Sequence, residues 1–239
     1  MLYYARGSVT EEISQGEMET ALEEVFRTLE PKKKVLVIPP DITRLHSRAG
    51  AITQFAWKYY GSRLTDILPA LGTHMPLTEE ELSQMFGETP KELFRVHNWR
   101  KDLVTLGIVP SEFVAEVSEG RVEYEWPAQV NSLLVKGRFD LIISPGQVVP
   151  HEVIGMANYN KNVFVGTGGQ EGINKSHFLG AVYGMERIMG KKKSPVRDVL
   201  NYASRNFARD LPLLYVLTVL GRREDGGLAL RGLFIGDDE

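Results

Sequence analysis

The sequence has no cysteine among its 239 residues. Disulfide bonds, thiolate metal sites and cysteine nucleophiles are therefore excluded together. No apolar run reaches the ~18 residues that a membrane-spanning helix needs, and the N-terminus lacks the basic-then-apolar pattern of a signal peptide. The net charge of −3 offers no general electrostatic basis for binding nucleic acid or a membrane. These absences favour a globular protein of the cytoplasm.

The sequence that remains alternates strand patterns with helix patterns. The predicted strands are Lys34–Pro39, Thr65–Leu71, Phe139–Ser144, Asn162–Val165, Leu213–Leu220 and Leu228–Ile235. The predicted helices are Ala49–Tyr60, one starting near Thr78 at a Thr-x-x-Glu capping box, Ile173–Ile188 and Pro195–Phe207, and Val130–Lys136 fits either a helix or a strand. This alternation predicts an α/β fold of the Rossmann-like kind, with a largely parallel sheet, helices on both faces and an added hairpin within Phe113–Trp126.

Polar residues come directly after several of the predicted strands. They are Asp41–Arg44, His74, Gly146–His151 and Gly166–Gly169. In open parallel sheets ligands bind at the carboxyl ends of the strands. We therefore expect these residues to gather at one edge of the sheet and to form a chemical site.

Taken one at a time, these residues have ordinary explanations. Asp41 and Arg44 could clamp an anion, with Asp41 fixing the guanidinium fork, or could be a helix N-cap and a surface ion pair. His74 and His151 could be general bases or structural loop histidines. Lys161 could be a solvated lysine. The remaining histidines divide into His177, a helix cap or surface residue, His97, taken as structural, and His46, expected outside the site.

The glycine loop Gly166-Thr167-Gly168-Gly169 could hold a phosphate with its backbone amides. It does not match the dinucleotide fingerprint, because residue 171 is glutamate, and no Gly-Lys-Ser/Thr comes after it as in a P-loop. His151 and His177 have no third ligand at short spacing, so this is not a zinc pattern.

Three segments together carry a resemblance. They are Asp41-Ile42-Thr43-Arg44, Gly72-Thr73-His74-Met75-Pro76-Leu77-Thr78-Glu79-Glu80, and Gly146–Gly166 with the helix after it. In the last segment nine residues separate His151 from Lys161, and fifteen separate Lys161 from His177. In order and spacing, the set resembles the nickel-dependent lactate racemase family, and the resemblance covers most of the chain.

The resemblance implies a cofactor, a nickel pincer nucleotide of the pyridinium-3,5-bisthiocarboxylic acid mononucleotide type. Lys161 would hold it through a thioamide link, and His177 would supply the protein's nickel ligand. Sulfur and carbon from the cofactor would complete a square-planar nickel field, which needs no cysteine. Cofactor biosynthesis proteins would be partners of the chain.

The resemblance further implies racemisation or epimerisation of a small 2-hydroxy acid. His74 and His151 would be the acid/base pair, one on each face of the substrate, while hydride passes to the cofactor and back. Asp41, Thr43 and Arg44 would bind an anion, either the cofactor phosphate or the substrate carboxylate.

The chain departs from the family pattern before Lys161. The family usually has a Gly-Gly pair there, where this chain has Asn158-Tyr159-Asn160, and the Pro-Gly turn after the lysine is replaced by Val165-Gly166. Bulkier residues would crowd a close backbone approach to the cofactor. The departures suggest a substrate other than lactate. Trp99, Tyr159 and the Asn-rich stretch Asn158–Asn162 hint at a polar pocket for a sugar acid.

Residues 1–239 are expected to be the catalytic, cofactor-binding domain, without the family's C-terminal domain that closes over the site. The isolated fragment could then be inactive. Two hypotheses compete with the racemase: a non-catalytic protein that binds an anion or sugar acid on the same fold, and a nicotinamide-dependent dehydrogenase, which the missing dinucleotide fingerprint disfavours.

Overall fold

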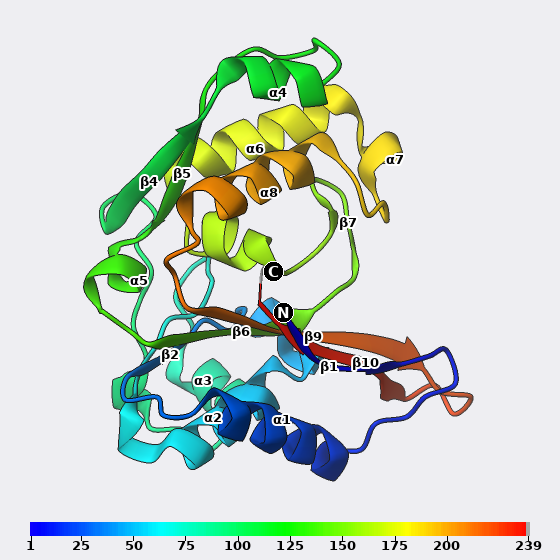
Figure 1. Cartoon of the computed structure of the whole chain (residues 1–239). Helices are drawn as coiled ribbons and strands as arrows, with labels where there is room; N and C mark the ends of the chain where they lie inside the picture. Colours follow the sequence, from blue (N-terminus) through cyan, green and yellow to red (C-terminus); the bar gives the residue numbers. More distant parts are fainter. Residues whose placement is uncertain (238–239) are drawn as a thin grey trace.

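The computed structural model describes residues 1–237 as an α/β fold around one six-stranded sheet, in the order β1-β10-β9-β6-β2-β3 (Figure 1). The strands are β1 Leu2–Gly7, β2 Val35–Val37, β3 Leu64–Ile67, β6 Leu141–Gln147, β9 Leu213–Arg222 and β10 Leu228–Gly236. Strands β9, β6, β2 and β3 are parallel, and β10 and β1 extend the β9 edge in antiparallel fashion. The predicted largely parallel sheet is confirmed.

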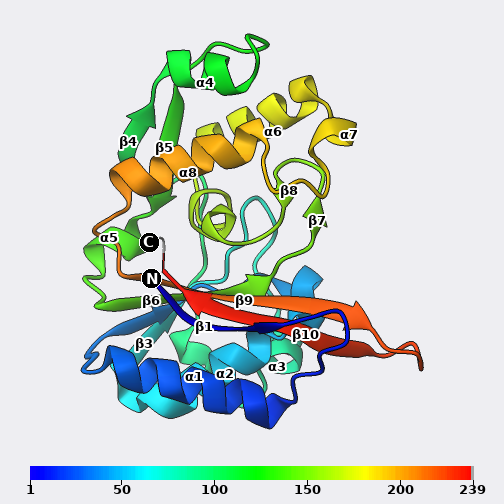
Figure 2. The same cartoon turned by 45° about the vertical axis from the view of Figure 1, so that its right-hand side comes forward.

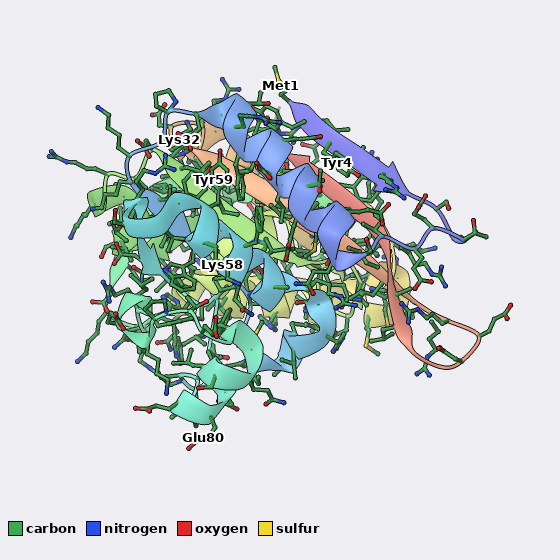
Figure 3. The ribbon with its side chains drawn as sticks, turned by 90° about the horizontal axis from the view of Figure 1, so that it is seen from below. Met1, Tyr4, Lys32, Lys58, Tyr59 and Glu80 are labelled. Carbon is green, nitrogen blue, oxygen red and sulfur yellow. The ribbon has the colours of Figure 1, made fainter. Side chains whose placement is uncertain are left out.

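Helices cover both faces of the sheet (Figures 1 and 2). On one face lie α1 (Gln15–Leu29), α2 (Ala49–Tyr60) and α3 (Glu79–Phe86), which Figure 3 views from below. On the other lie α6 (Gln170–Tyr183) and α8 (Pro195–Phe207), with the shorter α4 (Ser111–Val117), α5 (Ser132–Lys136) and α7 (Met185–Ile188).

The alternation of strand side chains explains the two layers, because neighbouring residues of a strand face opposite ways. In β6, Leu141 and Ile143 pack into the core that includes Phe26 of α1, whereas Ile142 packs into the core that includes Leu200 of α8. A strand buried on both faces therefore reads as a continuous apolar run, as the sequence does here.

Apolar periodicity and capping residues predicted the positions of several helices correctly. Both α2 and α8 have the predicted bounds, and Ser194 caps α8 by accepting from the Arg197 amide. The capping box at the start of α3 is present, with Thr78 and Glu81 each accepting from the other's backbone amide. The predicted helix Ile173–Ile188 divides into α6 and α7 at Gly184, whose φ of 107° leaves the helical region.

The N-terminal elements β1 and α1 were not predicted. A local signal existed for α1, because Ser14 and Glu17 form the same capping box that indicates α3. No comparable signal exists for β1, which is defined by its antiparallel pairing with β10 at the far end of the chain.

The predicted hairpin within Phe113–Trp126 is wrong. Residues Ser111–Val117 form α4, and the hairpin-like ribbon pairs β4 (Leu103–Val109) with β5 (Trp126–Asn131) on either side of that helix. The Glu119-Gly120 pair has positive φ at both residues, but this turn ends α4 instead of joining two strands. Turn residues indicate where the chain reverses, but they do not indicate whether a helix or a strand comes before the turn.

The predicted strand Asn162–Val165 is also wrong. Residues Asn162–Gly166 form a π-helix, in which the Thr167 amide donates to the Asn162 carbonyl, 2.9 Å away. All five residues are buried. In a short run that is buried on all sides, periodicity cannot distinguish a helical turn from a strand, because the run has no exposed face in either case. Lys161 therefore leads into a helical turn and not into a strand.

The other short elements are the 3-10 turns η1 (Ile42–Ser47), η2 (Gly61–Arg63) and η3 (Lys91–Leu93), and the pair β7 (Pro150–His151) and β8 (Gly155–Met156). Within residues 1–237, no helix combines the length and apolar composition required to cross a membrane.

Candidate active site

A cleft of about 250 Å³ opens beyond the carboxyl ends of β2, β3 and β6. All seven residues proposed from the sequence line it: Asp41, Thr43, Arg44, His74, His151, Lys161 and His177. His46 and His97 are not among its lining residues, in agreement with expectation. A larger cavity of about 670 Å³, beside Arg205 and Pro212, has no histidine in its lining. The chemistry-bearing residues thus converge as the strand topology predicts.

Asp41 joins the first two loops of the cleft. One carboxylate oxygen accepts from the backbone amide of Thr43, 3.1 Å away, and caps η1. The other is hydrogen-bonded to Nδ1 of His74. A carboxylate only accepts, so neutral His74 carries its proton on Nδ1 and presents the lone pair of Nε2. Since the His74 side chain is 60% exposed and Asp41 is buried, the pair presents a base to an open cleft.

The expected role of Asp41 towards Arg44 is wrong in one respect. The side chain of Asp41 is committed to Thr43 and His74 and makes no ion pair with the Arg44 guanidinium within the described part of the chain. Arg44 has no side-chain partner there either, although it is half-buried and lines the cleft. A guanidinium with open donors is suited to a carboxylate or phosphate.

His151 has the opposite proton arrangement from His74. Its Nδ1 accepts from the backbone amide of Val153, 3.1 Å away, so the neutral ring carries its proton on Nε2. Burial, together with the positive charge of the nearby Lys161, lowers the pKa of His151 to about 4, although the Glu152 carboxylate acts in the opposite direction. His151 is therefore neutral near pH 7 and offers a hydrogen-bond donor to the cleft.

Lys161 is a cation without a carboxylate partner among residues 1–237. Burial lowers the pKa of its ammonium group to about 8, and the positive charge of Arg44 contributes, while Asp41 acts in the other direction. A lysine amine with a depressed pKa is a nucleophile at mild pH. Its environment thus fits a covalent attachment point.

The segment before Lys161 adopts glycine-like backbone angles without glycine. Asn158 and Tyr159 have φ of 68° and 60°, in the left-handed region. This conformation costs residues with a Cβ about 1–2 kcal/mol, asparagine less than tyrosine. The stretch in which the resemblance expects a Gly-Gly pair thus contains two left-handed residues that carry side chains. The Tyr159 ring packs on Tyr215, 4.5 Å between centroids, and does not line the cleft.

His177 lies on α6 with one ring nitrogen already occupied. Its Nδ1 donates to the carbonyl of Ile173, 2.7 Å away, which leaves the Nε2 lone pair available. This is the usual arrangement of a metal-binding histidine, whose second nitrogen is fixed by a carbonyl or carboxylate. No group of three or more histidine, aspartate or glutamate side chains within residues 1–237 could hold a metal. His177 could therefore offer a single imidazole ligand to a metal.

Two amide side chains in the cleft lack partners within the described residues. They are Asn162, through its buried Nδ2, and Gln147, through its buried Oε1. A buried polar atom without a hydrogen bond is unfavourable by about 1–3 kcal/mol unless a ligand or water satisfies it. The sequence pointed to Gln147 only as part of the segment 146–151 and to Asn162 only as part of the Asn-rich stretch 158–162, and it assigned neither residue a role of its own.

The glycine loop serves packing more than ligand binding. His97 donates from Nε2 to the Gly168 carbonyl, 3.0 Å away, and accepts from the Asn131 amide at Nδ1. Burial lowers the pKa of His97, so it is neutral. A Cβ on Gly168 would lie 1.9 Å from the Phe164 carbonyl oxygen, and of the loop's three glycines only Gly166 lines the cleft. Only the first residue of the loop, Gly166, therefore contributes to the lining of the cleft.

The chain is similar to known proteins in sequence and in fold. The family model described as "Lactate racemase N-terminal domain" matches residues 7–189. The chain belongs to this family. The matched residues include every candidate site residue, and they end before α8, so that α8, β9 and β10 lie outside the match. No curated protein matches the chain.

Solved structures share the fold of this chain. A crystal structure of a protein from Thermotoga maritima has 26% sequence identity and a TM-score of 0.82, and the match covers 95% of this chain and 56% of that one. The lactate racemase apoprotein from Thermoanaerobacterium thermosaccharolyticum has 21% identity and a TM-score of 0.69, over 95% of this chain and 53% of that one. This member of the lactate racemase N-terminal domain family thus spans little more than half the length of these structures.

Proposed function

We propose that the chain is the catalytic domain of a 2-hydroxy acid racemase or epimerase that uses a lysine-linked nickel pincer nucleotide. The observation that carries the proposal is the convergence of two histidines of opposite proton arrangement, His74 and His151, with Lys161 and His177 in one cleft. A racemase needs an acid and a base on opposite faces of a planar intermediate, and these two rings supply them.

The residues present fit the cofactor. Lys161 would hold it through its depressed-pKa amine, His177 would bind nickel through Nε2, and Arg44 would receive an anionic group. The unpartnered amides of Asn162 and Gln147 would gain hydrogen bonds from bound cofactor or substrate. When bound, the cofactor would supply a hydride acceptor that the protein's own side chains lack.

The chain's residues would handle the protons. His74 would take the substrate hydroxyl proton at Nε2, and the Asp41 carboxylate would stabilise the resulting imidazolium. Arg44 would orient the substrate or cofactor by binding its carboxylate or phosphate.

His151 would have to accept and return a proton on the opposite face. A thioamide at Lys161 carries no positive charge, so the link would remove the second-largest cause of the low His151 pKa. The pKa of His151 would then rise towards its ordinary value. To exchange roles with His74, the ring would also have to release the Val153 amide, because Nε2 can accept a proton only when the hydrogen is on Nδ1.

The test uses the protein co-expressed with the cofactor-making proteins. Intact mass should show an adduct that is lost in Lys161→Arg, and elemental analysis should show nickel that is lost in His177→Ala. A panel of single-enantiomer 2-hydroxy acids, including sugar acids, should be converted to mixtures by chiral chromatography. Unmodified Lys161 and no nickel under these conditions would contradict the proposal.

A non-catalytic protein that binds an anion or sugar acid is the second candidate. The open donors of Arg44 and the unpartnered amides of Asn162 and Gln147 favour it, because they recognise a polar anion without doing chemistry. Calorimetric titration with sugar acids separates the two: this candidate expects binding without turnover and little change in affinity in His74→Ala.

A further inference from the structure

Arg197, on α8, is a buried arginine with no part in the proposed chemistry of the cleft. Its guanidinium donates to the side-chain oxygen of Asn160, to the Met156 carbonyl at 2.6 Å and to the Asn158 carbonyl at 3.2 Å. All three acceptors belong to the segment that leads into Lys161. Among residues 1–237 Arg197 has no carboxylate partner, and these hydrogen bonds of its guanidinium all go to this segment.

The same segment is held from three further sides. Asn160 also donates to Asn201, one turn along α8, at 2.8 Å. The Tyr159 ring packs on Tyr215 of β9. The Asn158 amide lies against the bare Cα of Gly146, where a Cβ would come within 1.7 Å of Nδ2. A segment with two successive left-handed residues that are not glycine needs such support, because the unrestrained chain would relax to ordinary angles.

We infer that Arg197 is the positioning residue of Lys161: it holds residues 156–160 in the backbone shape that presents the lysine to the cleft. Glycine adopts positive φ without strain, whereas Asn158 and Tyr159 do not, so the guanidinium does here what a glycine pair would do by itself. Arg197 lies outside the 7–189 family match. The meaning of the inference for catalysis rests on the proposed role of Lys161, but the position of the lysine can be measured without the cofactor.

The readout is the pH dependence of acetylation of Lys161 by acetic anhydride, measured by peptide mass spectrometry. Exposed Lys58 of α2 serves as internal reference (Figure 3). The charged groups that act on Lys161 are Arg44, Asp41, Glu152 and Arg197. A positioned Lys161 should be half-reactive near pH 8. A lysine released into water should move towards its ordinary value of about 10.4.

Three variants separate position from charge. Arg197→Lys keeps the charge but cannot reach three acceptors, and should raise the midpoint by about one pH unit or more, a roughly tenfold slower acetylation at pH 7.5. Arg197→Met should raise it at least as far. Adding Asn158→Gly and Tyr159→Gly to Arg197→Lys should return the midpoint towards that of the unaltered chain, because glycines need no clamp. The control is Arg205→Met, an exposed arginine of the same helix.

An unchanged midpoint in folded Arg197→Lys would overturn the inference, and so would a shift that the two glycines fail to reverse, since Arg197 would then act only in general packing. The outcome is separable from that of the proposed function. A midpoint that responds as expected, in a protein that never acquires the nickel adduct, would sustain the inference and defeat the proposed function. An adduct that forms equally in Arg197→Lys would do the reverse.

Discussion

Replacing Lys161 by methionine should stabilise the folded chain at neutral pH. The pKa of Lys161 falls from its ordinary 10.5 to about 8, chiefly through burial. At about 1.36 kcal/mol per pH unit, this corresponds to an upper bound of ~3.4 kcal/mol against the charged form. Because the residue is only partly buried, we discount this for solvent screening to ~1–2 kcal/mol. Methionine has a similar length and retains the packing of the stem.

The sign of this effect depends on pH. Below pH 8 both folded and unfolded chains carry the Lys161 charge, and the folded state bears its full burial penalty. Between pH 8 and 10.5 the folded chain loses the proton first, so the penalty disappears. The advantage of Lys161→Met should therefore be largest near pH 7 and should shrink steadily as the pH rises to about 10.

Urea unfolding at pH 7 and pH 10, followed by circular dichroism, measures both quantities. Lys58→Met is the matched control, because Lys58 is an exposed lysine of α2 on the opposite face of the sheet (Figure 3). It should change the free energy of unfolding by no more than ~0.5 kcal/mol at either pH. A Lys161→Met variant that is no more stable than the unaltered chain at pH 7, or whose advantage persists at pH 10, would refute the assignment of a desolvated lysine.

Three further predictions concern the surroundings of the site. If the proposed function holds, Asp41→Asn should lower turnover of the cofactor-loaded protein by ~10²-fold, because an amide cannot stabilise an imidazolium. Chiral chromatography measures the rate, and an unchanged rate would exclude the carboxylate from proton transfer. The pKa of His151 is lowered from 6.5 to about 4 in the folded chain, so the unfolded chain binds the proton first as the pH falls. The unaltered chain should therefore lose ~1–2 kcal/mol of its free energy of unfolding between pH 6.5 and pH 4. Urea unfolding should show a smaller loss over this range in His151→Gln. Gly146→Ala should destabilise the folded chain by ~1–3 kcal/mol, because the new Cβ would meet the Asn158 amide. Gly16→Ala is the control and should not destabilise it, because no atom lies within 4 Å of the new Cβ. Equal urea midpoints for the two variants would contradict the packing argument.

The sheet and the edge that carries the site could be predicted from the sequence, because both depend on local patterns. The buried apolar run at residues 139–144 predicted strand β6 correctly, and a parallel sheet places the loop after each of its strands at one edge. The π-helix that begins at Asn162 could not be predicted. Its five residues are buried on all sides, so periodicity holds no information about their backbone.

Arg197 was also missed, although a signal for it existed. It lies one helical turn from Leu200, on the buried side of α8. An arginine on an apolar stripe needs buried acceptors, and that need could have been inferred from the sequence. The identity of those acceptors could not, because Met156 and Asn158 offer backbone carbonyls, and every residue has one.

The different proton arrangements of His74 and His151 show why a site's chemistry depends on three-dimensional contacts more than on residue type. In each ring Nδ1 has one partner: a carboxylate that must accept for His74, and a backbone amide that must donate for His151. These partners leave a lone pair on one Nε2 and a proton on the other, so the cleft holds a base and a donor before any ligand binds. A racemase must also run with these roles exchanged, and the proposed loss of charge at Lys161 would make that exchange easier by raising the pKa of His151. Cofactor attachment and catalytic symmetry would then be one coupled property of the cleft.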